Sequence, residues 1–413
     1  MIIKRTDYNK KIINALENVP IVALIGARQV GKTTIMKNLP IEKDSIFLDA
    51  QDPETAELFK KHSVLKEYLE IHLNKDLNGI LMIDEFQFIN DISLMLKLMV
   101  DHNPKLSIIC SGSSSINILQ NVKESLAGRI RLIKVYSLSF SEYLLFKNEK
   151  LNKLYVKYSK DTSAEIIDPK IKLALNEYII YGGLPRVALA SEKAEKAALL
   201  DDIYKTYLLR DVRSFVKNED FVGFNRLLKL LAYQTGNMIN INNLSKECGL
   251  SYRKTEEYLY VLEQMYIIKL LQPFHSNYKK VIRKMQKIFF TDNGIRNIVM
   301  GALNAIDNRN DSGALLENYV FLELSRNLLS HYKLYYYRTL DGAEIDFIVD
   351  NMKTLFPVEV KNSSFKKTKN LKNISSFSEF HSCGQAYVVN RNLNKKNEAI
   401  HFIPSVLSGK LIF

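Results

Sequence analysis

The first 145 residues alternate short apolar runs with stretches of helical periodicity. A helix-like segment follows each of four apolar runs, 21-IVALIG-26, 45-SIFLDA-50, 79-GILMIDE-85 and 106-LSIICSGSS-114. Strands that are buried on both faces read as continuous apolar runs, and parallel strands need crossover connections that are usually helical. The pattern therefore predicts a parallel sheet covered by helices over residues 1–145.

The rest of the chain shows three further patterns. Residues 146–165 are rich in Lys and Asn and predict a loop, whereas residues 171–235 predict helices interrupted by the turn 181-YGGLPR-186. A helix-turn-helix followed by an apolar strand is predicted for 236–275, and a new α/β pattern begins near residue 280 with KIFFTD. Because 413 residues are too many for one compact core, we expect separate domains. Their predicted bounds are 1–145, 146–235, 236–278 and 279–413.

Composition points to a class of partner. Apolar residues make up 46% and charged residues 25%, which is ordinary for a globular protein. The net charge of +13 favours a polyanion such as nucleic acid over a membrane surface, because no basic amphipathic anchor stands out. The alternative is a Lys-rich composition shared by a whole proteome.

Location and redox chemistry follow from what the sequence lacks. The N-terminus has no apolar signal-peptide core, and no apolar run approaches the roughly 18–20 residues of a membrane span. Three distant cysteines without a CxxC motif predict neither disulfides nor structural zinc. We therefore expect a cytoplasmic protein with no membrane partner.

The most specific motif is 26-GARQVGKT-33, which fits the phosphate-binding pattern GxxxxGK[ST] between an apolar strand and a helix-like segment. In such a loop the backbone N–H groups surround the phosphates, Lys32 reaches the β- and γ-phosphates, and the Thr33 hydroxyl binds Mg²⁺. The motif predicts a site for ATP and Mg²⁺ whose contacts come from Gly26, Ala27, Arg28, Gln29, Val30, Gly31, Lys32, Thr33 and Thr34.

A buried strand that ends in two acids, 80-ILMIDE-85, follows about fifty residues later. Asp84 is expected to complete the Mg²⁺ shell beside the nucleotide, and Glu85 is placed to polarise the attacking water. The alternative is a chance glycine turn next to an unrelated acidic strand. The order of the two motifs, each on its required element, disfavours that alternative.

The chain resembles the AAA-type ATPases of the prokaryotic group that carries a restriction-endonuclease-like C-terminal domain of unknown function. The resemblance covers nearly the whole length and rests on the two nucleotide motifs with 84-DEFQ-87, 111-SGSSS-115, 126-LAGR-129, 137-SLSFSEYL-144, 181-YGGLPR-186 and 358-VEVK-361. It implies an ATPase (a P-loop NTP hydrolase) with an α/β multidomain fold. The implied parts are a P-loop AAA-type parallel sheet, a helical lid, a winged helix and a C-terminal restriction-endonuclease-like α/β domain.

Three residues take roles from this resemblance alone. Ser113 looks like the γ-phosphate sensor, Arg129 like an arginine finger or substrate-coupled arginine, and Arg186 sits where the lid approaches nucleotide. Simpler readings stay open: Ser113 satisfies a loop backbone, Arg129 is a solvated cation with Arg131 as an equal candidate, and 182-GGLP-185 is only a turn. Because finger arginines of this class act across subunits, a homo-oligomer is expected on the same ground.

The segment 240–274 reads as a helix, a stop at Gly249, an N-cap at Ser251, a second helix and a strand. Arg253 and Lys254 fall in the first turn of the second helix, where a recognition helix meets DNA. Cations there oppose the helix dipole, which indicates that they serve a partner rather than stability. The segment is a winged helix in outline, and a purely structural or protein-binding role is the alternative.

Acids on two C-terminal strands raise the question of a second site. In 343-AEIDFIVD-350 the alternation places Ile345 and Phe347 on one apolar face and Asp346 on the other, and in 357-PVEVK-361 Glu359 and Lys361 share a face. Upstream, Glu317 has apolar helical neighbours, so its carboxylate needs a partner.

These four residues match, in order and spacing, the restriction-endonuclease-like pattern of a helix acid, an Asp and ExK. In that chemistry Asp346 and Glu359 bind Mg²⁺, Glu317 completes the ligand set, and Lys361 orients the attacking water or stabilises the phosphorane charge. A short ExK motif also occurs on exposed strands by chance, and related domains lose cleavage while they keep DNA binding.

The C-terminal 63 residues carry 10 Lys and Arg against 3 Asp and Glu, and Lys366, Lys367, Lys369 and Lys372 follow the acids closely. They predict contacts to a nucleic-acid backbone, unless they form only a solvated charge run. We therefore expect an ATPase that acts on DNA through a winged helix and a basic, nuclease-like C-terminal domain. The alternative is a non-cleaving switch in which nucleotide occupancy controls a protein partner and the C-terminal domain is a scaffold.

Overall fold

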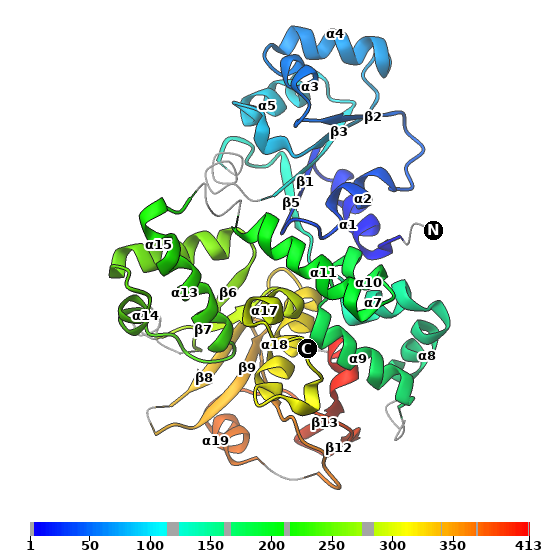
Figure 1. Cartoon of the computed structure of the whole chain (residues 1–413). Helices are drawn as coiled ribbons and strands as arrows, with labels where there is room; N and C mark the ends of the chain where they lie inside the picture. Colours follow the sequence, from blue (N-terminus) through cyan, green and yellow to red (C-terminus); the bar gives the residue numbers. More distant parts are fainter. Residues whose placement is uncertain are drawn as a thin grey trace. The chain divides into compact units, whose positions relative to one another are not determined.

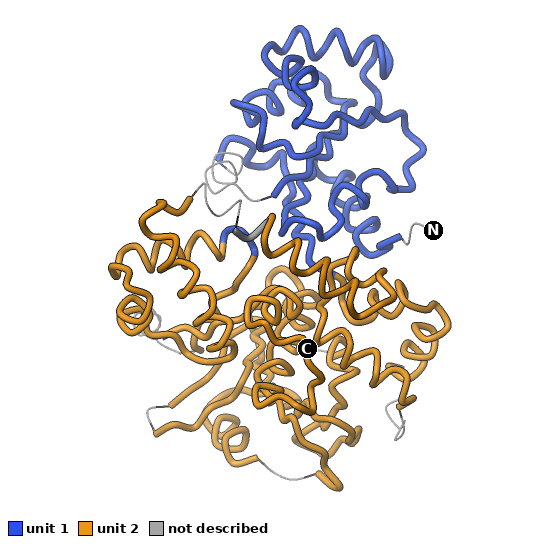
Figure 2. Tube along the Cα trace, viewed as in Figure 1, with its two compact units in different colours: residues 1–137, 264–266 blue, residues 138–263, 267–413 orange. Residues whose placement is uncertain are grey.

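A computed structural model describes residues 4–113, 124–160, 167–209, 215–274, 285–339, 341–368, 371–411 and 413. These residues form two compact units (Figure 2). Unit 1 comprises residues 1–137 with 264–266, and unit 2 comprises 138–263 with 267–413. Within the described part of the chain, no helix is both long and apolar enough to span a bilayer.

Unit 1 is built on a five-stranded parallel sheet with strand order β2-β3-β4-β1-β5 (Figure 1). The strands are β1 (Ile21–Ile25), β2 (Ser45–Asp49), β3 (Gly79–Asp84), β4 (Leu106–Gly112) and β5 (Ile130–Lys134). The helices of the unit are α1 (Thr6–Leu16), α2 (Lys32–Lys37), α3 (Pro53–Leu58), α4 (His62–His72) and α5 (Ile92–His102), with a short η1 (Phe86–Phe88). This confirms the parallel α/β sheet expected from the apolar runs.

Both faces of the central strand β1 are buried, which explains its uninterrupted apolar sequence. Ile21 and Ala23 pack in one core cluster with residues of α4 and α5, while Val22 and Leu24 are fully buried on the opposite face. The carboxyl ends of β1, β3 and β4 lie at one edge of the sheet, because all of these strands are parallel. That edge holds the phosphate loop and the acids of 80-ILMIDE-85.

Unit 2 begins with a helical region. Its elements are α7 (Phe140–Lys147), α8 (Glu149–Lys160), α9 (Pro169–Tyr181), α10 (Pro185–Leu189), α11 (Lys193–Ile203), η2 (Tyr204–Leu209), η3 (Asn218–Asp220) and α13 (Phe221–Tyr233). The loop predicted for 146–165 is wrong over its described part. The Asn148 side chain accepts backbone hydrogen bonds at the start of α8, and Tyr155 is buried against Phe140.

A helix-turn-helix followed by a small sheet comes next in unit 2. α14 (Ile241–Cys248) ends at Gly249, which has φ +69°, and α15 (Tyr252–Gln264) begins after Ser251, whose hydroxyl accepts from the Lys254 N–H. The strands β6 (Ile268–Leu271) and β7 (Lys287–Phe290) pair antiparallel. The predicted order of helix, glycine stop, serine cap, helix and strand is therefore present.

The C-terminal part of unit 2 is a mixed six-stranded sheet with order β12-β13-β11-β10-β9-β8. Its strands are β8 (Lys333–Arg338), β9 (Glu344–Asp350), β10 (Leu355–Val360), β11 (Ala386–Asn390), β12 (Lys395–Lys396) and β13 (Ile400–Pro404). The accompanying helical elements are α17 (Asn293–Met300), η4 (Ile306–Asn308), α18 (Ser312–Asn327), α19 (Lys372–Phe380) and η5 (Ser405–Lys410).

A β-bulge changes the facing of β9 from the predicted alternation. Tyr335 pairs with Ile348 and Tyr337 pairs with Ile345, so two steps on β8 span three on β9. Ile345 and Ile348 consequently share one core cluster, whereas Phe347 packs on aromatic rings elsewhere. The prediction that Ile345 and Phe347 share a face is therefore wrong, because the extra residue shifts the alternation by one.

Candidate functional site

The phosphate loop in unit 1 has the backbone that its glycines require. Gly31 precedes α2 with φ +92°, and a Cβ on Gly26 would collide with the Val135 carbonyl. Lys32 is buried, and its ammonium donates to the carbonyls of Gly26 (3.0 Å) and Ala27 (2.8 Å). Burial lowers the pKa of Lys32 to about 8, although Glu85 and Asp84 act in the opposite direction.

Asp84 is the last residue of β3, and its side chain lies next to Thr33, which follows the loop lysine Lys32. The Thr33 hydroxyl donates to Asp84 Oδ2 at 2.7 Å, and the Ser111 hydroxyl donates to Asp84 Oδ1. A hydroxyl and a carboxylate at this distance offer the oxygen ligands that Mg²⁺ prefers. The donor set therefore fits a magnesium ion shared between Thr33 and Asp84.

Glu85, Gln87 and Ser113 form a hydrogen-bonded group at the same sheet edge. The Gln87 amide donates to the Glu85 carboxylate and, at 3.1 Å, to Ser113 Oγ. Both the backbone N–H and the hydroxyl of Ser113 lie 3.4 Å from Glu85 Oε2. Glu85 itself has φ +49°, a strained backbone conformation for a residue with a side chain. The tertiary fold thus brings the predicted base and the predicted sensor together.

Arg5 was not singled out by the sequence, and its side chain is hydrogen bonded to the phosphate loop. Its guanidinium donates to the carbonyls of Val30 (3.0 Å) and Tyr136 (2.9 Å), and the residue is 6% exposed. These bonds tie the loop to the segment that follows β5. Nothing in the local sequence could have found Arg5, because its two partners lie 25 and 131 residues away.

Arg129 does not share the sheet edge of the nucleotide motifs. It precedes β5, and its carbonyl accepts from the N–H of Ile21 at the amino end of β1. Ile25, which directly precedes the loop, lies four positions after Ile21, and this places Arg129 about 13 Å along the strand from the start of the loop. Its guanidinium pairs with Asp101 at 2.6 Å. Arg129 therefore lies away from the nucleotide motifs of its own chain, and its predicted role as an arginine finger across subunits stays a prediction.

In unit 2 the carboxylates of α18 and β9 surround a buried lysine. The Lys287 ammonium lies 3.1 Å from Glu317, 2.5 Å from Glu344 and 3.8 Å from Asp346, and Lys287 is 1% exposed. Burial raises the pKa of Glu317 to about 8, with a further contribution from the charge of Asp346. The predicted partner of Glu317 is thus a lysine of β7, which the sequence pattern did not indicate.

Glu359 and Lys361 lie beside this cluster and pair with one another. Asp346 Oδ2 accepts the N–H of Val360 at 2.7 Å, so the bulged strand points this carboxylate at β10. Burial raises the pKa of Glu359 to about 7, and Asp346 contributes. Glu359 Oε2 is buried without a hydrogen-bond partner among the described residues, which fits a site for a cation.

The acids around Lys287 and Glu359 do not form a complete metal-binding site. Among the described residues no group of three or more His, Cys, Asp and Glu side chains is arranged to hold a metal ion. Lysine ammonium groups stand next to Glu317, Asp346 and Glu359. A magnesium ion bound by Glu317, Asp346 and Glu359 would therefore require the lysines to move.

The turn 181-YGGLPR-186 has a structural function within unit 2. Asp292 caps α17 and also accepts the N–H of Gly183 at 2.8 Å. Gly182 has φ +76°, and a Cβ there would collide with the Asp292 carboxylate. Arg186 is exposed at the second position of α10. The contacts of this motif favour the simpler reading of a turn that fastens α9 to α17.

Unit 2 also contains the lysines that the sequence assigned to nucleic-acid contacts. The Lys254 ammonium lies 2.5 Å from Asp220 and 3.2 Å from Glu219, and Asp220 also accepts from Tyr258 at 2.7 Å. Lys254 thus has carboxylate partners within unit 2, and its predicted contact with a partner molecule stays a prediction. Lys366, Lys367 and Lys372 are exposed, as expected, whereas Lys369 lies outside the described residues.

Family models match three segments of the chain. Residues 18–144 match a model described as an AAA domain. Residues 172–306 and 312–407 match two models that are each described as a domain of unknown function, DUF8612 and DUF4143 respectively. Most of the segment that matches an AAA domain lies in unit 1 and includes both nucleotide motifs, and the two models described as domains of unknown function name no activity.

Relatives with similar sequences have no described function. An uncharacterised protein of Mycobacterium tuberculosis is 27% identical over 368 residues, which cover 88% of this chain and 75% of the relative. An uncharacterised protein of Methanocaldococcus jannaschii is 28% identical over 338 residues, covering 80% of this chain and 72% of the relative.

Among solved structures, a Walker-type ATPase of Pyrococcus abyssi has a TM-score of 0.49 at 15% identity, covering 72% of this chain and 96% of its own. A STAND protein of Pyrococcus horikoshii has a TM-score of 0.31 at 14% identity, covering 79% and 46%.

Proposed function

We propose that the protein binds ATP with Mg²⁺ at the loop of unit 1 and hydrolyses it. The observation that carries this proposal is the 2.7 Å hydrogen bond between the Thr33 hydroxyl and Asp84, next to the buried ammonium of Lys32. It joins the two nucleotide motifs, which are fifty residues apart, at one sheet edge. When bound there, Mg²⁺ would neutralise phosphate charge and orient the leaving group.

The chain's own residues supply the remaining chemistry. Lys32 exchanges its two carbonyl partners for phosphate oxygens, and the loop N–H groups hold the same phosphates. Glu85 accepts hydrogen bonds from Gln87 and Ser113, so its carboxylate is held at the strand end where a water would attack. Ser113 donates toward the same position and is suited to sense the γ-phosphate.

Nucleotide binding and phosphate release test this proposal together. Lys32→Ala should lose both ATP affinity and hydrolysis, because the charge that holds the phosphates is removed. Glu85→Gln should retain ATP affinity and lose hydrolysis by a factor on the order of 10²–10⁴. Normal hydrolysis in Glu85→Gln would show that Glu85 is not the base. Lys105→Ala serves as the control, because Lys105 directly precedes the amino end of β4 and forms an exposed ion pair with Asp76.

A second function is action on DNA through unit 2. It is supported by the convergence of Glu317, Asp346, Glu359 and Lys361 from α18, β9 and β10, together with the net charge of +13. In this reading the segment 236–278 acts as a winged helix, and 279–413 acts as a restriction-endonuclease-like domain. Mg²⁺-dependent nicking of plasmid or branched DNA should then vanish in Asp346→Ala and Lys361→Ala. Equal nicking by the wild type and both variants would point to a contaminating nuclease.

The competing candidate is a switch without cleavage, and Lys287 favours it. The Lys287 ammonium already neutralises the acids that a metal would need. In this case the C-terminal domain binds DNA or a protein partner, and nucleotide occupancy controls the contact. DNA affinity that falls steeply with salt, without nicking by any variant, supports the switch, whereas a flat salt response removes nucleic acid from the partners.

A further inference from the structure

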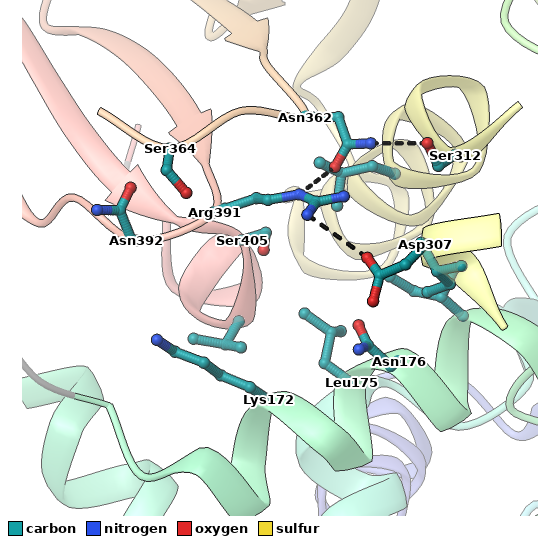
Figure 3. A pocket seen from close by; sticks show the side chains of 14 residues that line it. Lys172, Leu175, Asn176, Asp307, Ser312, Asn362, Ser364, Arg391, Asn392 and Ser405 are labelled. Carbon is teal, nitrogen blue, oxygen red and sulfur yellow. Dashed lines mark hydrogen bonds and ion pairs between the residues drawn. The ribbon is translucent and has the colours of Figure 1, made fainter. Parts of the chain in front are cut away.

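Unit 2 contains a cavity of about 270 Å³ whose lining includes none of the acids around Lys287. It lies between α9, the first turn of α18 and the residues that follow β10 and β11 (Figure 3). The lining mixes apolar side chains with hydroxyl, amide and charged groups. The polar and charged lining residues are Lys172, Asn176, Asp307, Ser312, Asn362, Ser364, Arg391, Asn392 and Ser405.

Arg391 is a cation among these lining residues. Its Nε donates to Asn362 Oδ1 at 2.8 Å, and the Asn362 amide donates to Ser312 Oγ at 2.9 Å (Figure 3). The other contact of the guanidinium is a long ion pair of 3.6 Å with Asp307. The guanidinium is therefore oriented by neutral groups and retains donors that face the cavity.

Lys172 supplies a second positive charge from the opposite side. It is an exposed residue of α9, and in the part of the chain that the structure describes it forms no ion pair. Lys172 and Arg391 outnumber the single carboxylate of Asp307 among the lining residues. The cavity thus combines two cations with hydroxyl and amide donors, which is the chemistry that binds a phosphate oxygen.

The lining also restricts what the rest of the ligand is. None of the 14 described residues that line the cavity is aromatic, so it offers no ring on which a base would stack. Leu175, Ile179 and Leu316 provide an apolar surface that suits the carbon face of a sugar. We propose that this cavity binds the phosphate of a nucleotide unit, carried either by a free nucleoside monophosphate or by a nucleic-acid strand.

Asp307 acts as the group that the phosphate replaces. The side chains of Arg391 and Asp307 are 42% and 76% exposed, and a solvent-exposed pair of this kind contributes little to stability. A phosphate with two charged oxygens outcompetes that carboxylate for the guanidinium. Removal of the Asp307 charge should therefore tighten ligand binding, a result that a purely structural ion pair would not produce.

The cavity adjoins the acid site through β10. Asn362 directly follows Lys361, so the Cα atoms of these two residues are about 3.8 Å apart. A strand whose phosphate occupied the cavity would pass close to Glu359 and Lys361. Only this nucleic-acid source of the phosphate rests on the DNA-directed function proposed above, because a free mononucleotide requires no cleavage and no DNA.

The test uses the full chain with Lys32→Ala as a background, so that the ATP loop does not compete for nucleotide. The probes are a nucleoside monophosphate, its nucleoside, and a short oligonucleotide with and without a 5′-phosphate, titrated by calorimetry or fluorescence anisotropy. Lys172→Gln and Arg391→Gln should each weaken binding of the phosphorylated probe by about tenfold, the loss of one charge-assisted contact. Asp307→Asn should tighten it. Lys170→Gln, two residues from Lys172 on α9 and outside the lining, should leave it unchanged.

The outcomes distinguish the two possible sources of the phosphate, and they also decide whether the cavity binds phosphate at all. If Lys172→Gln and Arg391→Gln weaken binding of the nucleoside monophosphate and Asp307→Asn tightens it, the ligand is a free nucleotide. If the same changes appear with the oligonucleotide alone, the ligand is a nucleic-acid strand. Equal binding of phosphorylated and unphosphorylated probes overturns the proposal, as does equal binding by Lys172→Gln and Lys170→Gln. Lys172→Gln keeps this decisive if Arg391→Gln fails to fold, since Lys172 is exposed. Asp346→Ala should abolish any nicking and leave binding in the cavity intact, so the two proposals fail separately.

Discussion

The ammonium of Lys287 lies 3.1 Å from the carboxylate of Glu317, in the position that a cation would occupy among the acids of unit 2. Lys287 comes from β7, Glu317 from α18, and Glu344 and Asp346 from β9. The ExK motif read alone suggests a vacant metal site. The fold instead places the Lys287 ammonium among these acids, where it neutralises their charge.

Lys287→Met should destabilise unit 2 strongly. The substitution keeps the length of the side chain but leaves buried carboxylates without a cation, which costs about 3–5 kcal/mol in the free energy of unfolding. Urea denaturation measures this loss. If the cluster can accept a metal, Mg²⁺ or Mn²⁺ should restore part of the lost stability in the variant.

Lys269→Met is the matched control for this change. Lys269 lies on β6, the partner strand of β7, and forms an exposed ion pair with Glu263. Its loss should cost about 0–1 kcal/mol. Equal effects of the two substitutions would mean that the Lys287 cluster is not coupled to folding.

Stability of unit 2 should fall as the pH rises from about 4.5 toward 8. Burial raises the pKa of Glu317 to about 8 and that of Glu359 to about 7, above their ordinary value of 4.5. In this range the folded state binds more protons than the unfolded state, so each rise in pH favours unfolding. Thermal melting between pH 5 and 9 measures the slope. Glu359→Gln, which cannot titrate, should give a flatter curve than the wild type, and a parallel curve would contradict the assignment.

Gln87→Ala should slow ATP hydrolysis without changing ATP affinity. The Gln87 amide is hydrogen bonded to both Glu85 and Ser113, so its removal frees the carboxylate to rotate away from the water. Single-turnover hydrolysis and nucleotide titration separate the two effects. A change in affinity alone would place Gln87 among the residues that bind nucleotide rather than those that position Glu85.

Arg129→Ala should leave hydrolysis by dilute protein unchanged. Arg129 pairs with Asp101 and lies at the sheet edge opposite the nucleotide motifs of its own chain. Hydrolysis should be measured over a wide range of protein concentration beside Arg131→Ala. A loss that appears only at high concentration would indicate that Arg129 reaches the nucleotide of a second copy, as the family resemblance implies.

Asp292→Ala should destabilise unit 2 while unit 1 keeps its nucleotide affinity. The Asp292 carboxylate accepts the N–H groups of Gly183, Gly294 and Ile295, and its loss leaves buried donors unsatisfied. We expect a cost of about 2–4 kcal/mol from the lost cap and the additional bond. Denaturant unfolding measures the cost, and Asp292→Asn, which keeps one acceptor oxygen, should recover part of it. An unchanged midpoint would contradict the structural role of 181-YGGLPR-186.

The sequence by itself determined the main features of the proposed nucleotide site in unit 1. An uninterrupted apolar strand, a glycine loop with Lys32 and Thr33, and a second strand ending in Asp84 and Glu85 are local patterns. The carboxyl ends of parallel strands all lie at the same edge of a sheet. Local patterns therefore suffice to predict that these residues converge. The same logic found the glycine stop and serine cap of the helix-turn-helix.

Only the tertiary structure decided the rest, because the deciding contacts join distant parts of the chain. Lys287 reaches Glu317 from thirty residues away, and Arg5 reaches Val30 and Tyr136 from 25 and 131 residues away. One extra residue at the bulge of β9 moved Ile345 to the face opposite Phe347, which no alternation rule reveals. Strand direction placed Arg129 at the far edge of its sheet. Periodicity reports burial along a segment, whereas the partner of a buried charge depends on which segments pack together.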